Sequence, residues 1–207
     1  KMCEHAVRRA LARCAMQPPQ IDLLLGGDLL NQIITANFAA RELSIPFLGL
    51  YGACSTMAES LLLGSMLIDG GYAERVACAA TSHFCTAERQ YRFPLEMGGQ
   101  TTPTAQRTVT GAGASLLVAP GYAGNAQFEH IFATGGTIGR VVDLGITDAS
   151  NMGAAMAPAA ADTLAAHLRE KECSVTDYDV IVTGDLGRFG SEMFAELCRD
   201  KGIDLAN

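Results

Sequence analysis

The sequence is short of charge, and of basic charge in particular. Only 18% of its 207 residues are charged, whereas 49% are hydrophobic, a composition typical of a globular protein with a sizeable core. Acidic residues outnumber basic ones by 22 to 15, which gives a net charge of −7. Because Lys and Arg also form no run or stripe, we exclude nucleic-acid binding as the function.

The sequence also lacks long apolar runs and paired cysteines. No run reaches the roughly 18 apolar residues of a membrane-spanning helix, and no signal-peptide pattern opens the chain. We expect a piece of a longer protein, because the chain begins inside a helical pattern. Scattered cysteines without a CxxC pair argue against zinc and favour a reducing compartment, and no motif calls for a cofactor or a resident metal. The seven cysteines are Cys3, Cys14, Cys54, Cys78, Cys85, Cys173 and Cys198.

Short apolar runs alternate with helical patterns, which predicts an α/β fold. Because the expected strands are uniformly apolar, we expect a largely parallel or mixed sheet between layers of helices. A polar segment over residues 82–92 and a long loop over 93–110 interrupt this alternation, and loops of that length are commonly functional. The expected strands cover residues 21–25, 47–50, 75–81, 112–119, 128–134 and 178–183. The expected helices cover residues 2–16, 29–43, 54–69, 154–172 and 191–201.

Cys54 stands where an apolar strand and a glycine turn lead into a helix. That helix is apolar on every side, so we expect it to be buried. Unpaired backbone N–H groups and the positive end of the helix dipole favour a thiolate or another anion at this position. Thr56 and Glu59 have the spacing of a capping box, so the helix start could lie a residue or two to either side. Cys54 either lines a ligand site or is a small packing residue.

Further candidates follow the strand at 75–81. His83 lies at the end of that strand, where open α/β sheets bind ligands, or is a hydrogen-bonded loop histidine. Arg89 and Arg92 share one face if their segment is helical, with Tyr91 between them. Such a set suits an aromatic dicarboxylate, although exposed surface charge or a subunit interface would explain it equally.

Neutral donors and one more arginine complete the candidates. Gln100 and Thr104 could line a polar pocket or merely solvate the long loop. Arg140 is either a pocket cation or one half of a salt bridge with Asp143. The glycine-rich runs lack both nucleotide-binding fingerprints, so we interpret them as close packing.

Longer runs resemble one family. The Cys54 turn followed by the glycine-rich strand at Thr108–Val118 resembles thiolase-like condensing enzymes, and the chain as a whole is similar to the stage V sporulation protein AD family. The resemblance implies two similar halves in a five-layer α/β arrangement, with residues 1–125 forming the first half and residues 126–207 opening the second. The runs that carry it are Gly27–Gln32, Gly49–Thr56, Gly98–Gln100, Pro103–Gln106, Thr108–Ala114, Thr137–Asp143, Asn151–Ala160 and Val182–Gly187.

The resemblance also implies a function. The family belongs to the machinery that moves dipicolinic acid, as its calcium chelate, into the developing spore. Its AD component is expected to bind that ligand and to be peripheral on the spore inner membrane, held by membrane proteins of the same complex. We expect a homodimer that pairs through the strand at 75–81. The ligand pocket would lie near Cys54, His83 and the loop at 99–106.

The resemblance leaves the question of catalysis open to test. Condensing enzymes carry a His- or Asn-rich motif after the strand that corresponds to residues 178–183, whereas this sequence has Asp185 there. Because a carboxylate opposes both a thiolate and an oxyanion, we expect a binding protein without condensing activity. The alternatives are an acyl-transferring enzyme that uses Cys54 and a structural subunit with a degenerate site.

Overall fold

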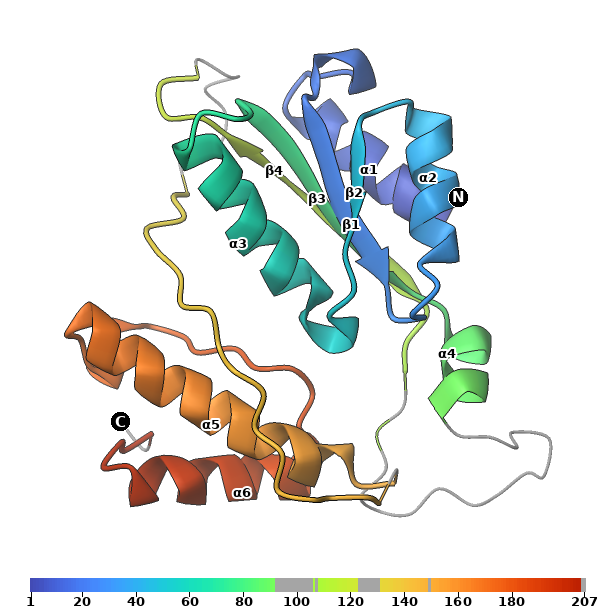
Figure 1. Ribbon diagram of the computed structural model, residues 1–207. Helices are drawn as coiled ribbons and strands as arrows, with labels where there is room; N and C mark the ends of the chain where they lie inside the picture. The colour runs from blue at the N-terminus through green and yellow to red at the C-terminus, as the bar shows by residue number, and fades with distance from the viewer. Residues whose placement is uncertain (92–105, 107, 123–130, 149, 206–207) are drawn as a thin grey trace. The chain divides into compact units, whose positions relative to one another are not determined.

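The computed structural model describes residues 1–91, 106, 108–122, 131–148 and 150–205. Contacts divide the chain into two compact units, which are described separately (Figure 1). Unit 1 comprises Lys1–Gln90 and Thr108–Ala133, and unit 2 comprises Tyr91–Arg107 and Thr134–Asn207. The expected division of the family fold between residues 125 and 126 stays a prediction.

Unit 1 is built on a four-stranded sheet in the order β2-β1-β3-β4. Strand β1 (Leu23–Asp28) pairs in parallel with β2 (Phe47–Gly49) on one side and with β3 (Arg75–Ser82) on the other. Strand β4 (Gly111–Val118) runs antiparallel beside β3. The expected mixed α/β fold is therefore confirmed.

The position of β3 corrects one expectation. This strand, the one through which we expected a dimer to pair, lies inside the sheet with β1 and β4 hydrogen-bonded on its two sides. Its backbone groups are already paired, so it offers no free edge to a second subunit. The edges of this sheet are β2 and β4, and the homodimer itself stays a prediction.

Helices cover both faces of this sheet (Figure 1). Helices α1 (Met2–Arg13) and α2 (Ile34–Leu43) pack on one face, where Leu24, Ala77 and Ala79 join their core. Helix α3 (Thr56–Asp69) lies on the other face, over Leu25, Val76 and Cys78. Neighbouring residues of one strand point to opposite faces, which is why the uniformly apolar strands feed two separate cores.

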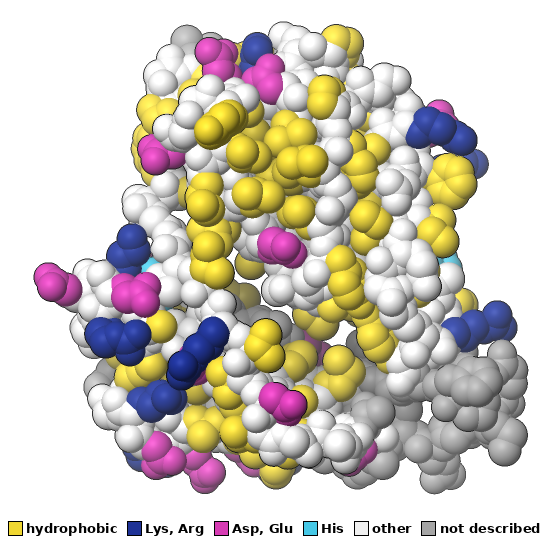
Figure 2. All heavy atoms as spheres, viewed as in Figure 1, with side chains coloured by type: hydrophobic (Ala, Val, Ile, Leu, Met, Phe, Trp, Pro, Cys, Tyr) yellow, Lys and Arg dark blue, Asp and Glu magenta, His cyan; other side chains and the backbone are white. Residues whose placement is uncertain are grey.

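Helix α3 is buried along one side rather than all round. Thr56, Ser60 and Gly64 are buried, whereas Met66 is 52% exposed. Gly64 faces the sheet, and a Cβ added there would come within 2.8 Å of Leu117 Cδ1. The small residues let the helix lie close to the strands. Figure 2 shows hydrophobic side chains gathered on the face of unit 1 that carries α3.

Unit 2 is built on two long helices. Helices α5 (Met152–Lys171) and α6 (Gly187–Asp200) contact each other at two glycines. A Cβ on Gly190 would come within 2.7 Å of Gly153 Cα, so only glycine permits this approach. Pro158 lies inside α5 and is buried. Among the helices of the described residues, none has the length and hydrophobicity needed to cross a bilayer.

Two expected strands, one at the sequence border between the units and one in unit 2, are not formed by the described residues. Residues 131–134 and 178–183 belong to no strand, and residues 128–130 lie outside the described part of the chain. A short apolar run becomes a strand only where a neighbour pairs with its backbone groups. Here Val180 is 73% exposed and Val182 is 84% exposed, so the apolarity of this run is not matched by burial.

The polar segment after β3 forms helix α4 (Phe84–Tyr91), as its spacing allowed. Most of the expected loop at 93–110 lies outside the described residues.

Candidate functional site

The candidate site lies where three parallel strands end. Asp28 is the last residue of β1, Cys54 follows β2, and His83 follows β3. Carboxyl ends of parallel strands share one edge of the sheet, which is where open α/β sheets bind ligands. Because β1 lies between β2 and β3, the ends of those two strands are two strand spacings apart, which is about 10 Å. The fold thus brings Cys54 and His83 to the same edge.

Local hydrogen bonds shape the turn around Cys54. The Gly52 N–H donates to Thr56 Oγ1 over 3.1 Å, and Thr56 Oγ1 donates to the Ala53 carbonyl over 3.0 Å. Ser55 is the N-cap residue of α3, without a side-chain cap, so the capping box that Thr56 and Glu59 suggested is not formed. Cys54 therefore lies one residue before the helix cap and is exposed.

The backbone directly before Cys54 is strained. Ala53 has a φ of 49°, in the left-handed region that costs a non-glycine residue roughly 1–2 kcal/mol. Gly27 makes room for this turn, because a Cβ there would lie 2.0 Å from the Leu50 carbonyl oxygen. Such strain persists where the surrounding structure fixes it, and it is frequent at functional sites. Apart from the glycines, no residue pattern predicts this strain.

A carboxylate lies beside the same turn. Glu59 Oε2 would come within 2.8 Å of a Cβ added to Gly52. Its negative charge opposes an anion near Cys54, and so it offsets the favourable effect of the helix start. The turn therefore suits a neutral or charge-compensated ligand better than a free dianion.

Asp28 caps helix α2 from the end of β1. Its Oδ2 accepts hydrogen bonds from the backbone N–H groups of Thr35, over 2.8 Å, and Ala36, over 3.2 Å. This cap explains why α2 begins at Ile34, later than expected from the pattern. Burial raises the pKa of Asp28, against the effect of these two hydrogen bonds. Within the described residues its Oδ1 is buried without a partner.

His83 lies at the start of α4. Its carbonyl accepts hydrogen bonds from the Ala87 N–H and the Thr86 hydroxyl, and its side chain is exposed. The Phe84 N–H donates to Thr110 Oγ1 over 3.0 Å, which ties α4 to the segment that enters β4.

Glu88, near the C-terminal end of α4, also connects this helix to the segment before β4. It is buried and accepts hydrogen bonds from the backbone N–H and the hydroxyl of Thr108, at 3.1 Å and 3.0 Å. Sequence reasoning missed Glu88, because nothing in its neighbours distinguishes it from a surface glutamate. Arg89 is exposed on α4. The other candidates of this region, Arg92, Gln100 and Thr104, lie outside the described residues.

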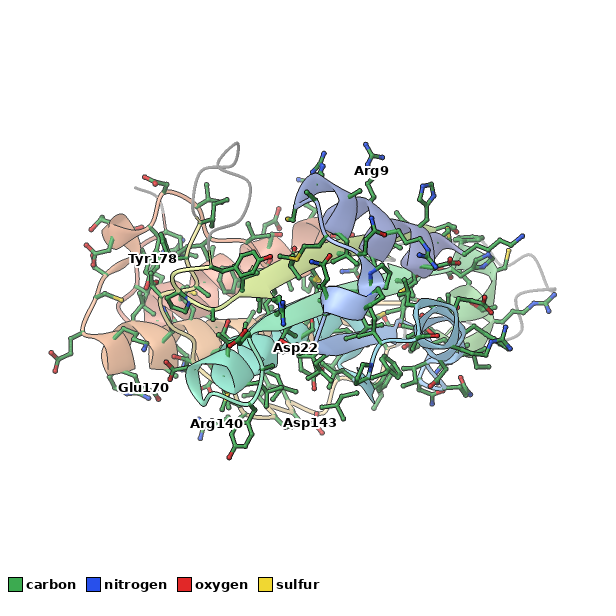
Figure 3. The ribbon with its side chains drawn as sticks, turned by 90° about the horizontal axis from the view of Figure 1, so that it is seen from above. Arg9, Asp22, Arg140, Asp143, Glu170 and Tyr178 are labelled. Atoms are coloured by element: carbon green, nitrogen blue, oxygen red, sulfur yellow. The ribbon has the colours of Figure 1, made fainter. Side chains whose placement is uncertain are left out.

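Two residues of unit 2 receive structural roles. Asp185 Oδ1 accepts a hydrogen bond from the Gly187 N–H over 2.9 Å at the start of α6. Arg140 forms a two-pronged ion pair with Asp162, at 2.9 Å and 3.1 Å, which raises the pKa of Arg140 and lowers that of Asp162. Of the two interpretations of Arg140, the salt bridge is confirmed, with Asp162 as its partner rather than Asp143. Figure 3 labels Arg140 and Asp143.

The described residues hold no group of three or more His, Cys, Asp or Glu side chains placed to bind a metal ion.

Solved structures share the fold of this chain. A structure of OleA from Xanthomonas campestris matches 99% of this chain and 64% of its own, with a TM-score of 0.69 and 16% identity. The 3-oxoacyl-(acyl carrier protein) synthase III of Pseudomonas aeruginosa PAO1 matches 96% of this chain and 64% of its own, with a TM-score of 0.63 and 17% identity. At these identities the likeness shows the thiolase-like fold alone.

The sequence comparisons reach further. The stage V sporulation protein AD of Bacillus subtilis (strain 168) is 48% identical over 203 residues, which are 98% of this chain and 58% of that protein. The chain thus spans somewhat more than half the length of this relative. The family model for stage V sporulation protein AD matches residues 1–207. The chain therefore belongs to the stage V sporulation protein AD family.

Proposed function

We propose that this protein binds dipicolinate without catalysis and serves the transport machinery of the developing spore. The observation that carries the proposal is the convergence of Cys54, a helix start and His83 at one edge of the sheet, in a chain of a sporulation family. Backbone N–H groups and an imidazole are donors that suit carboxylates. Arg89, from the exposed side of α4, would add a cation.

The charge near Cys54 favours the calcium chelate over the free acid. Dipicolinate carries two negative charges, and Glu59 lies beside the turn that would receive it. Calcium offsets the charge of the ligand, so the chelate meets less repulsion from Glu59 than the free dianion does. Calcium enters this proposal as part of the ligand.

The absence of condensing activity is part of the same proposal. An active thiolate needs a base and a site that stabilises negative charge. Glu59 opposes that charge beside Cys54, and Asp185 stands where the family resemblance places a His- or Asn-rich motif. The hydrogen bond from Gly187 gives Asp185 a structural role at the start of α6 instead.

Acyl transfer by Cys54 is the second candidate, and two observations favour it. The thiol is exposed, and the strained Ala53 precedes it, as expected for a reactive nucleophile held on a fixed turn. This candidate predicts a covalent thioester on Cys54 after incubation with an acyl-CoA, followed by turnover.

One labelling experiment separates the two candidates. The full-length protein is treated with iodoacetamide, and the modification of each cysteine is followed by peptide mass spectrometry. Binding at the sheet edge predicts that dipicolinate with calcium slows the labelling of Cys54 and leaves that of Cys14, on the α1 side of the sheet, unchanged. Protection by acyl-CoA with a stable thioester and turnover would instead establish the enzyme. Equal labelling with and without either compound would contradict a site at Cys54.

Association with membrane proteins of the same sporulation complex, a peripheral position on the spore inner membrane and a homodimer belong to the same proposal and rest on the family resemblance.

A further inference from the structure

Unit 2 contains a chain of four hydrogen-bonded side chains, none of which belongs to the candidate site. Thr137 Oγ1 lies 2.9 Å from His167 Nδ1, and His167 Nε2 lies 2.7 Å from the Tyr178 hydroxyl. The same hydroxyl lies 3.3 Å from Cys173 Sγ. The members come from the irregular segment before α5, from α5 itself and from the turn that follows it; Figure 3 labels Tyr178. A thiol and an imidazole are thus joined through one phenol.

We infer that Cys173 is a reactive thiol, activated through Tyr178 and His167, and that it exchanges with small disulfides. The inference is independent of ligand binding at the edge of the sheet in unit 1.

The donors and acceptors of this chain fit two proton arrangements. With a neutral imidazole, the Cys173 thiol donates to the Tyr178 oxygen, Tyr178 donates to His167 Nε2, and Nδ1–H donates to Thr137. When the thiol proton passes to Tyr178 and the phenol proton passes to His167, Tyr178 donates to the thiolate and the imidazolium donates to Tyr178. Every member keeps its hydrogen bonds in both arrangements, so the thiolate forms without leaving a polar group unpaired.

The electrostatics of Tyr178 agree with this direction of transfer. Its hydrogen bond with Cys173 is the main reason why the pKa of Tyr178 lies above its ordinary value, with partial desolvation and the nearby Asp177 adding to the effect. The phenol therefore keeps a proton of its own and stays available as a donor to the thiolate. A charge-assisted hydrogen bond of this kind is stronger than one between neutral groups.

The other cysteines provide a comparison for the reactivity of Cys173. Burial raises the pKa of Cys3 and of Cys78 to about 11, and it also raises that of Cys198, so these thiols keep their protons. Cys173 is half-buried, and so is Cys14, which makes Cys14 a matched comparison. The thiolate is the form that attacks a disulfide.

The exchange step is balanced without a further reactant. The Cys173 thiolate attacks one sulfur of the small disulfide and forms a new S–S bond, and the old S–S bond breaks. The second sulfur of the small disulfide leaves as a thiolate. Tyr178 keeps the proton taken from Cys173, and the phenol proton that passed to His167 stays there until solvent removes it.

The test uses 4,4′-dithiodipyridine at pH 7 on the full-length protein, with each cysteine read by peptide mass spectrometry. We expect Cys173 to react at least tenfold faster than Cys14. Tyr178→Phe, which removes one oxygen atom, should lower the rate at Cys173 at least tenfold, and His167→Gln should do the same. Tyr72→Phe, at an exposed tyrosine of unit 1, should leave the rate unchanged.

The direction of the change separates activation from loss of structure. Local unfolding in Tyr178→Phe would expose Cys173 and raise its rate, whereas loss of activation lowers it. Equal rates at Cys173 and Cys14 in the unmodified protein would overturn the inference. A rate at Cys173 that neither Tyr178→Phe nor His167→Gln lowers would overturn it as well.

Discussion

Replacing Gly27 with alanine tests how tightly the end of β1 is held against the chain that leads to Cys54. The new Cβ would lie 2.0 Å from the Leu50 carbonyl oxygen and 3.0 Å from Thr56 Cγ2. Overpacking in a core commonly costs 1–3 kcal/mol, and a backbone oxygen cannot rotate away as a flexible side chain can. We therefore expect the free energy of unfolding to fall by about 3 kcal/mol, at the upper end of that range.

Gly113→Ala is the matched control, since a Cβ at Gly113 would meet nothing within 4 Å. Where the backbone accepts alanine, losing a glycine stabilises a protein by about 0.4–1 kcal/mol. The two variants should thus differ by roughly 3–4 kcal/mol, which combines these two magnitudes. Circular dichroism during denaturant unfolding measures this difference, because the chain has no tryptophan for fluorescence.

The same variant should change the turn at Cys54. Leu50 must move to make room, and Leu50 precedes Cys54 by four residues. We expect a changed rate of Cys54 alkylation in Gly27→Ala and an unchanged rate in Gly113→Ala. Equal stability of the two variants, with equal alkylation rates, would refute the close packing on which the geometry of the site depends.

Three further predictions concern carboxylates. Partial burial alone would raise the pKa of Asp22, but hydrogen bonds from the backbone of Glu74 and Arg75 and from the Arg75 side chain lower it. The stability that ionised Asp22 contributes is therefore present at neutral pH and is lost as the pH falls through its lowered pKa. Because Asp22 is partly exposed and water screens its charge, Asp22→Asn should lower the free energy of unfolding by less than about 1 kcal/mol at pH 7, and by less still near pH 3, in denaturant unfolding. Burial raises the pKa of Asp28, so the folded protein loses stability as the pH rises and Asp28 ionises. The melting temperature of Asp28→Asn should therefore rise relative to that of the unmodified protein between pH 4 and pH 7. A constant difference between the two melting temperatures would contradict this. Glu59→Gln should tighten the binding of calcium-free dipicolinate more than that of the chelate, by about 3- to 10-fold for a charge pair near the surface, and equal effects on both in titration calorimetry would rule out the proposed role of Glu59.

The sequence predicted the parts of this fold that depend on local pattern. The alternation of apolar strands with helices, the turn that carries Cys54 and the position of His83 after β3 all follow from residue type and spacing. The sheet edge then follows from the parallel order of the strands. These features need no knowledge of which distant segments meet.

The features that depend on distant contacts could not be predicted in this way. Ala53 adopts a positive φ that no local pattern indicates, and Asp28 shortens α2 by capping it from another element. Val180 and Val182 belong to an apolar run that has no strand beside it in the described residues. The outer face of α3 is a further example, because an apolar helix surface predicts burial but does not predict which segment packs against it.

The most direct test of the central claim is calorimetric titration of the full-length protein with dipicolinate, with and without calcium. The account predicts saturable binding that is stronger with calcium, that exceeds the binding of benzoate, and that is weakened by Cys54→Ala and His83→Ala. His5→Ala, at an exposed histidine of α1, should bind as the unmodified protein does. Binding that does not distinguish dipicolinate from benzoate, or no binding at all, would contradict the account.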